Sequence, residues 1–183
     1  NEQIRTTISL NNVPVKIAGA HAGISVGPDG ATHQALEDIA LMRVQPRITV
    51  LVPCDAIEAR KATVAAAFSS GPFYIRFGRE KSPVFTTEKT PFEIGKAIIL
   101  REGKDVTVIG CGLLLYNALM AARELSKEGV EATIINSHTI KPLDVTTILN
   151  SVKRTKAVVT VEEHQIAGGL GSAVAEVLSQ NFP

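Results

Sequence analysis

The residues of this sequence best suited to chemistry lie in one glycine-rich stretch, His21–Gln34. It contains two imidazoles, His21 and His33, and the carboxylate of Asp29. Imidazole titrates near neutral pH and can exchange a proton with a sugar oxygen, while a carboxylate can bind a hydroxyl. Because the stretch follows an apolar run of strand length at 13–20, we expect it at the carboxyl edge of a sheet, where α/β proteins bind ligands.

Two arginines are expected at the same edge. Arg76 and Arg79 lie at the end of a third predicted strand, 73–77. The fork of a guanidinium can bind two oxygens of a phosphate. Both are therefore candidate phosphate ligands; for one of the two, but not for both, a solvated arginine at the start of a linker is the favoured interpretation.

Other interpretations of the same stretch stay open. The set His21, Asp29 and His33 can bind zinc, although spacings of eight and four residues do not place all three on one helical turn. The stretch can also be a structural glycine turn whose histidines hydrogen-bond to the backbone.

Two further glycine patterns lie between strands and helices. Gly110–Gly112 resembles the opening of a dinucleotide-binding turn, but Leu115 stands where a third glycine is needed. Gly168–Ser172 opens the last predicted helix, where it either binds an anion or packs helix against strand. His138 and His164 also follow predicted strands and, without evident catalytic partners, are interpreted as structural.

Strand-length runs alternate with helical stretches along the chain. We expect strands at 13–20, 48–52, 73–77, 95–100, 105–109, 130–135 and 157–161, and helices at 34–43, 56–69, 113–127, after Asp144, and at 169–178. The alternation predicts an α/β protein with two three-layer α/β/α lobes and mainly parallel sheets. Asp55 and Glu58 predict a capping box, and a turn at 101–104 predicts a hairpin.

Composition excludes several classes of function. The chain has 183 residues, 45% of them hydrophobic and 20% charged, with a net charge of +1, which is typical of a folded domain. Aromatic residues are 4% and basic residues are scattered, so we expect no nucleic-acid partner. No apolar stretch approaches the roughly 18–20 residues of a membrane span. Cys54 and Cys111 adjoin apolar runs, as buried thiols of a cytoplasmic protein would.

The stretch His-Ala-Gly-Ile-Ser-Val-Gly-Pro-Asp-Gly-Ala-Thr-His-Gln closely resembles the transketolase motif. Agreement continues over nearly the whole chain, at 37–43, 53–55, 76–79, 140–144 and 161–172. The resemblance implies an enzyme of the pentose phosphate type that uses thiamine diphosphate and a divalent cation, usually Mg²⁺. Such enzymes move a two-carbon ketol unit from a ketose phosphate to an aldose phosphate, and they are dimers with the cofactor between subunits.

Matched to the family plan, residues 1–82 resemble the second half of the pyrimidine-binding domain. Residues 83–91 resemble a linker, and residues 92–183 resemble the C-terminal domain without its last strand. The family's Gly-Asp-Gly motif for diphosphate and metal is absent from the sequence, and its activating glutamate lies upstream. We therefore expect no metal or main cofactor residues here, and a chain that is inactive without an N-terminal part, whether on the same or a separate chain.

The resemblance also implies a role for each candidate residue. Arg79 corresponds to the arginine that clamps the substrate phosphate, and His21 to the histidine at the phosphate or sugar end of the channel. Asp29 corresponds to the aspartate that binds the hydroxyl next to the reacting carbonyl. His33 corresponds to the histidine beside the thiazolium that bonds the oxygens of the transferred unit. Arg76 has no firm counterpart and is kept as a second phosphate contact.

Three alternatives remain. Deoxyxylulose-phosphate synthases share the core of the motif but usually have Asp-Arg where this chain has Ala20-His21. The beta chains of 2-oxo-acid dehydrogenases share the Lys-Pro-Leu-Asp segment but lack the step Asp29-Gly30. A non-catalytic dimerisation module would need none of the polar residues of the motif, so their joint presence argues against it.

Overall fold

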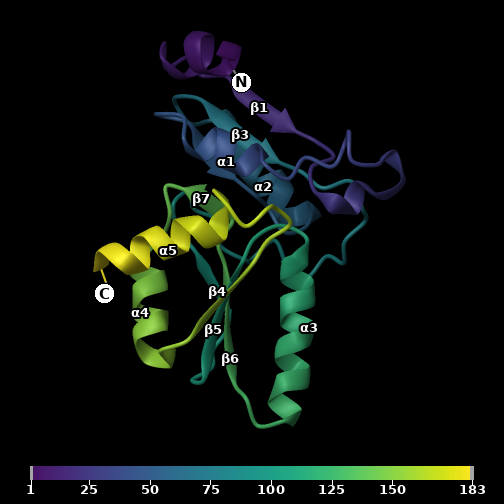
Figure 1. Cartoon of the computed structure of the whole chain (residues 1–183), viewed down its shortest axis with the longest axis vertical. Coiled ribbons are helices and arrows are strands. Elements are labelled where there is room, and N and C mark those ends of the chain that lie inside the picture. The colour runs from purple at the N-terminus through teal and green to yellow at the C-terminus, as the bar shows by residue number, and fades with distance from the viewer. Residues whose placement is uncertain (1, 182–183) are drawn as a thin grey trace.

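The computed structural model describes residues 2–181, which form two lobes stacked along the long axis of the molecule (Figure 1). The elements in chain order are the π-helical turn η1 (Ile4–Ser9), β1 (Lys16–Gly19), the 3-10 segment η2 (Ile24–Asp29), α1 (Asp38–Arg43), β2 (Thr49–Leu51), α2 (Ala56–Ala67), β3 (Phe73–Arg76), β4 (Ile98–Arg101), β5 (Val106–Gly110), α3 (Leu114–Lys127), β6 (Ala132–Asn136), β7 (Thr139–Lys141), α4 (Val145–Thr155), β8 (Val158–Val161) and α5 (Leu170–Asn181). No helix within residues 2–181 is long and apolar enough to cross a membrane.

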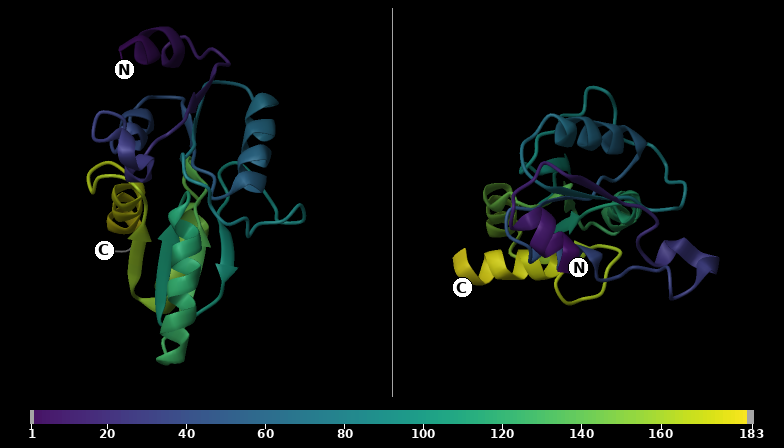
Figure 2. Two further views of the ribbon diagram at one scale, coloured as in Figure 1. Left: turned by 90° about the vertical axis from the view of Figure 1, so that its right-hand side faces the viewer. Right: turned by 90° about the horizontal axis from the view of Figure 1, so that it is seen from above.

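The N-terminal lobe is built on a sheet of order β1-β3-β2-β7. Strands β1 and β2 run parallel to the central strand β3, and β7 is antiparallel to β2. Helices α1 and α2 lie on opposite faces of this sheet (Figure 2). All four residues of β3 are buried, as expected for a strand covered on both faces.

The C-terminal lobe is built on a sheet of order β4-β6-β5-β8. Strand β5 is parallel to both β6 and β8, and β4 is antiparallel to β6. Helix α3 covers one face, and α4 and α5 cover the other (Figure 1). Two three-layer α/β/α lobes with mainly parallel sheets are therefore confirmed.

The predicted hairpin between 95–100 and 105–109 is wrong. Strand β4 does not pair with β5, because β6 lies between them in the sheet. The turn crosses the start of β6: the backbone N–H of Gly103 donates to Thr133 Oγ1 at 2.9 Å, and that of Asp105 donates to the carbonyl of Glu131 at 3.0 Å. A Cβ on Gly103 would lie 2.3 Å from the backbone of Ala132, so glycine is required here for a crossing rather than for a hairpin.

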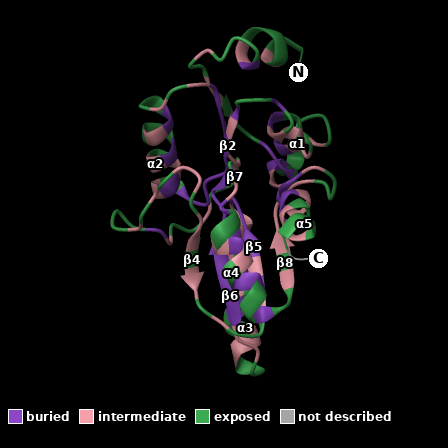
Figure 3. Cartoon of the chain, turned by 90° about the vertical axis from the view of Figure 1, so that its left-hand side faces the viewer, coloured by how far each residue is buried: buried purple, intermediate pink, exposed green. Residues whose placement is uncertain are grey.

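Strand β7 was not predicted, and it joins the two lobes. It comes from the C-terminal half of the chain but pairs with β2, and the backbone N–H of Val52 donates to the carbonyl of His138 at 2.8 Å. One cluster of buried hydrophobic side chains includes Val50 and Tyr74 from the first sheet together with Ile109 and Ile135 from the second. The lobes therefore share a hydrophobic core, which runs through the buried centre of the molecule (Figure 3).

The start of one helix and the capping of another differ from expectation for local reasons. Helix α1 begins at Asp38 rather than near residue 34, because the carbonyl of Ala35 accepts a hydrogen bond from Gly23 in the preceding loop. Asp55 caps α2 by accepting from the backbone N–H of Glu58 at 2.9 Å, as predicted. The carboxylate of Glu58, however, accepts from the backbone of Cys54 at 2.7 Å rather than from Asp55, so the box is only half formed.

Residues 77–97 connect β3 to β4 without helix or strand. They are nevertheless fastened to α2. The ammonium of Lys61 donates to the carbonyls of Thr87 and Thr90. The carboxylate of Asp55 accepts from the backbone of Phe85 at 3.0 Å and of Thr86 at 2.7 Å. The connection follows one face of the N-terminal lobe as a consequence.

Candidate active site

The stretch His21–Gln34 begins where β1 ends, as expected. His21 has a left-handed backbone with φ of 59°, which turns the chain out of the sheet. The backbone N–H of Ala22 then donates to the carbonyl of Phe77 at 3.2 Å, and that of Gly23 donates to Ala35 at 2.9 Å. These bonds place the start of the stretch between the end of β3 and the segment that leads into α1.

Arg79 and Asp29 meet at this edge of the sheet. Arg79 Nη1 lies 2.9 Å from Asp29 Oδ2, and it also donates to the carbonyl of Val26 at 2.9 Å. The side chains of Arg79 and Asp29 are 36% and 37% exposed. Each side chain is therefore partly open to solvent, and a guanidinium can bind a phosphate while a carboxylate can bind a hydroxyl.

The two imidazoles flank the same stretch. Both His21 and His33 are exposed. His33 Nδ1 lies 2.9 Å from the hydroxyl of Thr32, and the backbone N–H of His33 donates to the carbonyl of Gly30 at 3.0 Å. The structure thus presents two imidazoles, a carboxylate and a guanidinium from one loop and the adjoining strand end.

Arg76 occupies a different position from Arg79. Its side chain is 5% exposed, and Nε lies 2.8 Å from Asp38 Oδ2. Nη2 donates to the carbonyls of Ala35 at 3.2 Å and Glu163 at 2.8 Å. The same carboxylate of Asp38 accepts from the hydroxyl of Tyr74 at 2.7 Å, and burial together with that carboxylate raises the pKa of Tyr74, so the phenol remains a neutral donor. Arg76 connects three segments of the framework beneath the loop.

The C-terminal lobe contributes a residue that the sequence did not single out. Glu163 follows β8, and its carboxylate accepts hydrogen bonds from the backbone N–H and the hydroxyl of Ser25, the latter at 3.1 Å. The backbone N–H of Gln165 donates to the carbonyl of Leu36 at 2.9 Å. The only signal in the sequence was a pair of acidic residues directly after a predicted strand.

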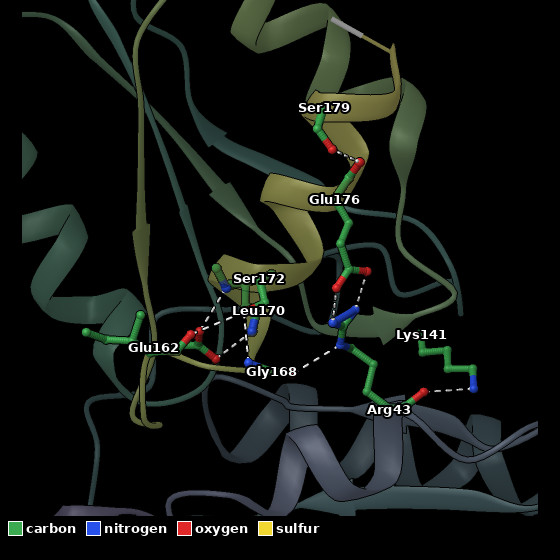
Figure 4. Close-up of polar contacts among 10 residues, drawn as sticks. Arg43, Lys141, Glu162, Gly168, Leu170, Ser172, Glu176 and Ser179 are labelled. Carbon is green, nitrogen blue, oxygen red and sulfur yellow. Dashed lines mark hydrogen bonds and ion pairs between the residues drawn. The ribbon is translucent and has the colours of Figure 1, made fainter. Parts of the chain in front are cut away.

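Glu162 fills the place where an anion was considered. Its carboxylate accepts from the backbone N–H groups of Leu170 at 2.7 Å and Gly171 at 2.8 Å, at the start of α5 (Figure 4). A Cβ on Gly169 would lie 2.3 Å from Glu162 Oε2. The glycines here allow helix α5 to pack closely on the end of β8, so the packing interpretation holds.

The remaining candidates are structural. The backbone N–H of Gly112 donates to the carbonyl of Val52 at 3.2 Å, so the turn at 110–112 packs one lobe on the other. Cys54 and Cys111 are buried free thiols, as predicted. His138 is fully buried, with its ring stacked on Phe92 at a centroid distance of 4.3 Å.

No three His, Cys, Asp or Glu side chains within residues 2–181 come together as ligands for a metal ion. The set His21, Asp29 and His33 is therefore not a zinc site in this structure. Nor do these residues fit a magnesium site, and no step below is assigned to a metal.

Two family models cover most of the chain. The model of the transketolase pyrimidine-binding domain matches residues 1–84, and that of the transketolase C-terminal domain matches residues 95–182. The chain belongs to the transketolase family. The lobe that presents His21, Asp29, His33 and Arg79 corresponds to the transketolase pyrimidine-binding model.

Relatives agree with this assignment. The 6-deoxy-6-sulfo-D-fructose transketolase subunit SqwH of a Clostridium species is 40% identical over all of this chain and 56% of its own length. A putative transketolase C-terminal section of Methanocaldococcus jannaschii is 43% identical over 98% of this chain and 57% of its own length. A solved split-gene transketolase, described as an inactive beta4 tetramer, superposes with a TM-score of 0.92 at 45% identity, over 100% of this chain and 59% of its own. This transketolase-family chain thus spans little more than half of these relatives.

Proposed function

We propose that this chain supplies the substrate-binding part of a thiamine-diphosphate-dependent transketolase, which moves a two-carbon ketol unit between sugar phosphates of the pentose phosphate type. The observation that supports this most directly is the partly exposed pair Arg79–Asp29 at the same edge of the sheet as the loop that carries the exposed residues His21 and His33. Together they offer a phosphate ligand, a hydroxyl ligand and two proton-exchanging groups from the loop His21–Gln34 and the adjoining strand end. In this proposal, residues 1–82 form a partial pyrimidine-binding domain, 83–91 a linker and 92–183 the C-terminal domain.

Each side chain has a separate task in this proposal. Arg79 binds the phosphate of the sugar, and Asp29 accepts a hydrogen bond from the hydroxyl beside the reacting carbonyl. His21 and His33 donate hydrogen bonds to sugar oxygens and hold protons that move as the carbonyl oxygen gains and loses charge. Thiamine diphosphate, when bound, supplies the carbon chemistry. The residues of this chain bind and orient the sugar.

Arg76 is better suited to positioning than to phosphate binding. Its guanidinium is buried and engaged by Asp38 and by two backbone carbonyls. A phosphate would have to compete with these partners inside the protein, where removing one partner of a buried ion pair is costly. We therefore propose that Arg76 fixes the segments beneath the loop His21–Gln34, while Arg79 contacts the phosphate.

The active assembly needs a second part. The split-gene and C-terminal-section relatives support an N-terminal part on the same or a separate chain. In this proposal that part binds the diphosphate and Mg²⁺. We propose a dimer or two-chain assembly in the cytoplasm, where the buried thiols of Cys54 and Cys111 stay reduced. The chain alone is expected to be inactive.

The test compares substrate pairs and one variant in the assembled enzyme. Xylulose phosphate with ribose phosphate is the transketolase pair, whereas pyruvate with glyceraldehyde phosphate is the deoxyxylulose-phosphate synthase pair. We expect turnover of the first pair only, and a loss of roughly a hundredfold or more in His33→Ala with unchanged thermal stability. Arg123→Ala, exposed on α3, is the matched control. Turnover of the pyruvate pair, or an unchanged rate in His33→Ala, contradicts the proposal.

A further inference from the structure

One side chain of the C-terminal lobe reaches the loop that bears the proposed substrate ligands. Glu163 lies just after β8, and both of its carboxylate oxygens accept hydrogen bonds from Ser25: one from the backbone N–H and the other from the hydroxyl, at 3.1 Å. Bonds to an ionised acceptor are stronger than those between neutral groups, and two of them fix orientation as well as distance. Ser25 is the second residue of η2, so this contact sets where η2 begins.

The loop is shaped to receive this carboxylate. Gly23 has a φ of 95°, and a Cβ at this position would lie 2.4 Å from both Cδ and Oε2 of Glu163. The carboxylate therefore occupies the space that any other residue at position 23 would need for its side chain. Both the backbone conformation and the close approach require glycine here.

The backbone of Glu163 is itself held in place. Its carbonyl accepts from Arg76 Nη2 at 2.8 Å, and two residues later the N–H of Gln165 donates to Leu36 at 2.9 Å. The buried ion pair of Arg76 with Asp38 anchors the guanidinium from the N-terminal lobe. Glu163 thus presents its side chain from a fixed main chain rather than from a free loop.

The contact between Glu163 and Ser25 is linked through the adjoining backbone to Arg79, the proposed phosphate ligand. Val26 follows Ser25, is fully buried, and accepts through its carbonyl from Arg79 Nη1 at 2.9 Å. The same nitrogen of Arg79 lies 2.9 Å from Asp29 at the end of η2. A shift of Ser25 would therefore move the carbonyl that orients Arg79.

We infer that Glu163 is a positioning residue, through which the C-terminal lobe fixes the substrate loop and aligns Arg79 and Asp29 for the sugar phosphate. The inference deepens the proposed function and rests on it for the identity of the substrate. It gives the C-terminal lobe a role in the reaction without any contact with substrate or cofactor.

The experiment compares three variants. Glu163→Ala removes both bonds to Ser25. Glu163→Gln preserves the shape and both contacts, because its oxygen can accept from the backbone and its amide can donate to the hydroxyl. Glu162→Ala is the matched control: it removes an adjacent carboxylate with two backbone bonds, but those bonds cap α5 within the C-terminal lobe.

Two readouts are used. Hydrogen exchange of the segment 22–34, followed by mass spectrometry on the chain itself, needs no activity. We expect exchange about tenfold or more faster in Glu163→Ala, since a charge-assisted pair is lost. In the assembled enzyme we expect the KM for the sugar phosphate to rise roughly tenfold in Glu163→Ala with a smaller change in kcat, and to return near normal in Glu163→Gln. Glu162→Ala is expected to lower the melting temperature without either effect.

The outcomes separate this inference from the proposed function. Unchanged exchange in Glu163→Ala, or an equal change in Glu162→Ala, overturns the positioning role whatever the reaction proves to be. Altered exchange with an unchanged KM also overturns it, because the loop would then move without affecting the substrate. If the wild-type assembly transfers no ketol unit, the proposed function fails, while the exchange measurement still decides whether Glu163 fixes the loop.

Discussion

Nη1 of Arg79 and Oδ2 of Asp29 lie 2.9 Å apart, although one residue follows a strand and the other ends a 3-10 segment. Each side chain remains about one-third exposed. The pair therefore aligns a guanidinium and a carboxylate before any ligand arrives, with both side chains partly exposed to solvent. Preorganisation of this kind lowers the cost of ordering side chains on binding.

The first prediction concerns this pair. In the assembled enzyme, Arg79→Ala should raise the KM for a sugar phosphate tenfold or more, because a charge-assisted bond to phosphate is lost. The free energy of unfolding should change by less than about 1 kcal/mol, as is usual for an exposed pair. Steady-state kinetics and urea denaturation check the two parts. Arg60→Ala on α2, which removes an exposed pair with Glu88 of the connection 77–97, should leave the KM unchanged. An equal change in both variants would contradict the role of Arg79.

Arg76→Met should act on stability instead. Removing Arg76 leaves the carboxylate of Asp38 buried without its cation, which typically costs about 3–5 kcal/mol. Urea denaturation of the chain should show this loss, and Arg79→Met measured in parallel should show little. A stability of Arg76→Met close to wild type would mean that the buried pair does not hold the framework.

The two carboxylates at the start of α2, Glu58 and Asp55, should contribute to stability with opposite dependence on pH. Burial raises the pKa of Glu58, so the folded state holds its proton to higher pH than the unfolded state, and stability falls as pH rises above about 4.5. Glu58→Gln should therefore be within about 1 kcal/mol of wild type at neutral pH or more stable, since Asn136 Oδ1 is buried without a partner and can accept from the new amide once the Asn136 amide rotates.

Asp55 is the control for that substitution. Burial alone would raise its pKa, but hydrogen bonds from the backbone of Glu58 and Thr86 hold the pKa below its usual range. Its contribution to stability is present above the ordinary pKa of about 3.8 and is lost as pH falls. Asp55→Asn should cost about 2–3 kcal/mol, because an amide can accept only through one oxygen. Equal losses of unfolding free energy in Glu58→Gln and Asp55→Asn would contradict the opposite roles of these two carboxylates in stability.

His138 should make the fold sensitive to acid. Burial lowers its pKa from 6.5 to about 4. Between these two values the unfolded state binds a proton that the folded state does not, so stability falls as pH drops from 6.5 to 4, by about 3 kcal/mol at most. Urea denaturation across this range should show a smaller loss in His138→Phe than in wild type. His33→Phe, at an exposed position, should retain the full loss; the same slope in all three proteins would refute the prediction.

The sequence predicted the layers of the fold because strands and helices of ordinary length alternate along it. It did not predict β7, since Ser137, His138 and Thr139 are polar residues whose burial depends on the other lobe. The hairpin at 101–104 was predicted from a glycine that in fact allows a close crossing over β6. Both errors arise from contacts between segments distant in sequence.

In the candidate site too, local features could be predicted from the sequence, whereas contacts between distant segments could not. The placement of His21, Asp29 and Arg79 at one edge follows from residue type and from the position of each after a strand. The contact between Glu163 and Ser25 could not be predicted, because it depends on how the two lobes dock. Arg76 is buried although the exposed Arg79 follows only three residues later, and this burial likewise depends on Asp38 and on the carbonyl of Glu163.

The most direct test of the whole account is reconstitution. This chain is mixed with a polypeptide that contains the diphosphate-binding part of a transketolase of the same source, together with thiamine diphosphate and Mg²⁺, and ketol transfer from xylulose phosphate to ribose phosphate is measured. We predict no turnover by either part alone, turnover by the mixture, loss of most of that turnover when the chain bears His33→Ala, and a raised KM for the sugar phosphate when it bears Arg79→Ala. Turnover by this chain alone, or an active mixture that is indifferent to both substitutions, would contradict the account.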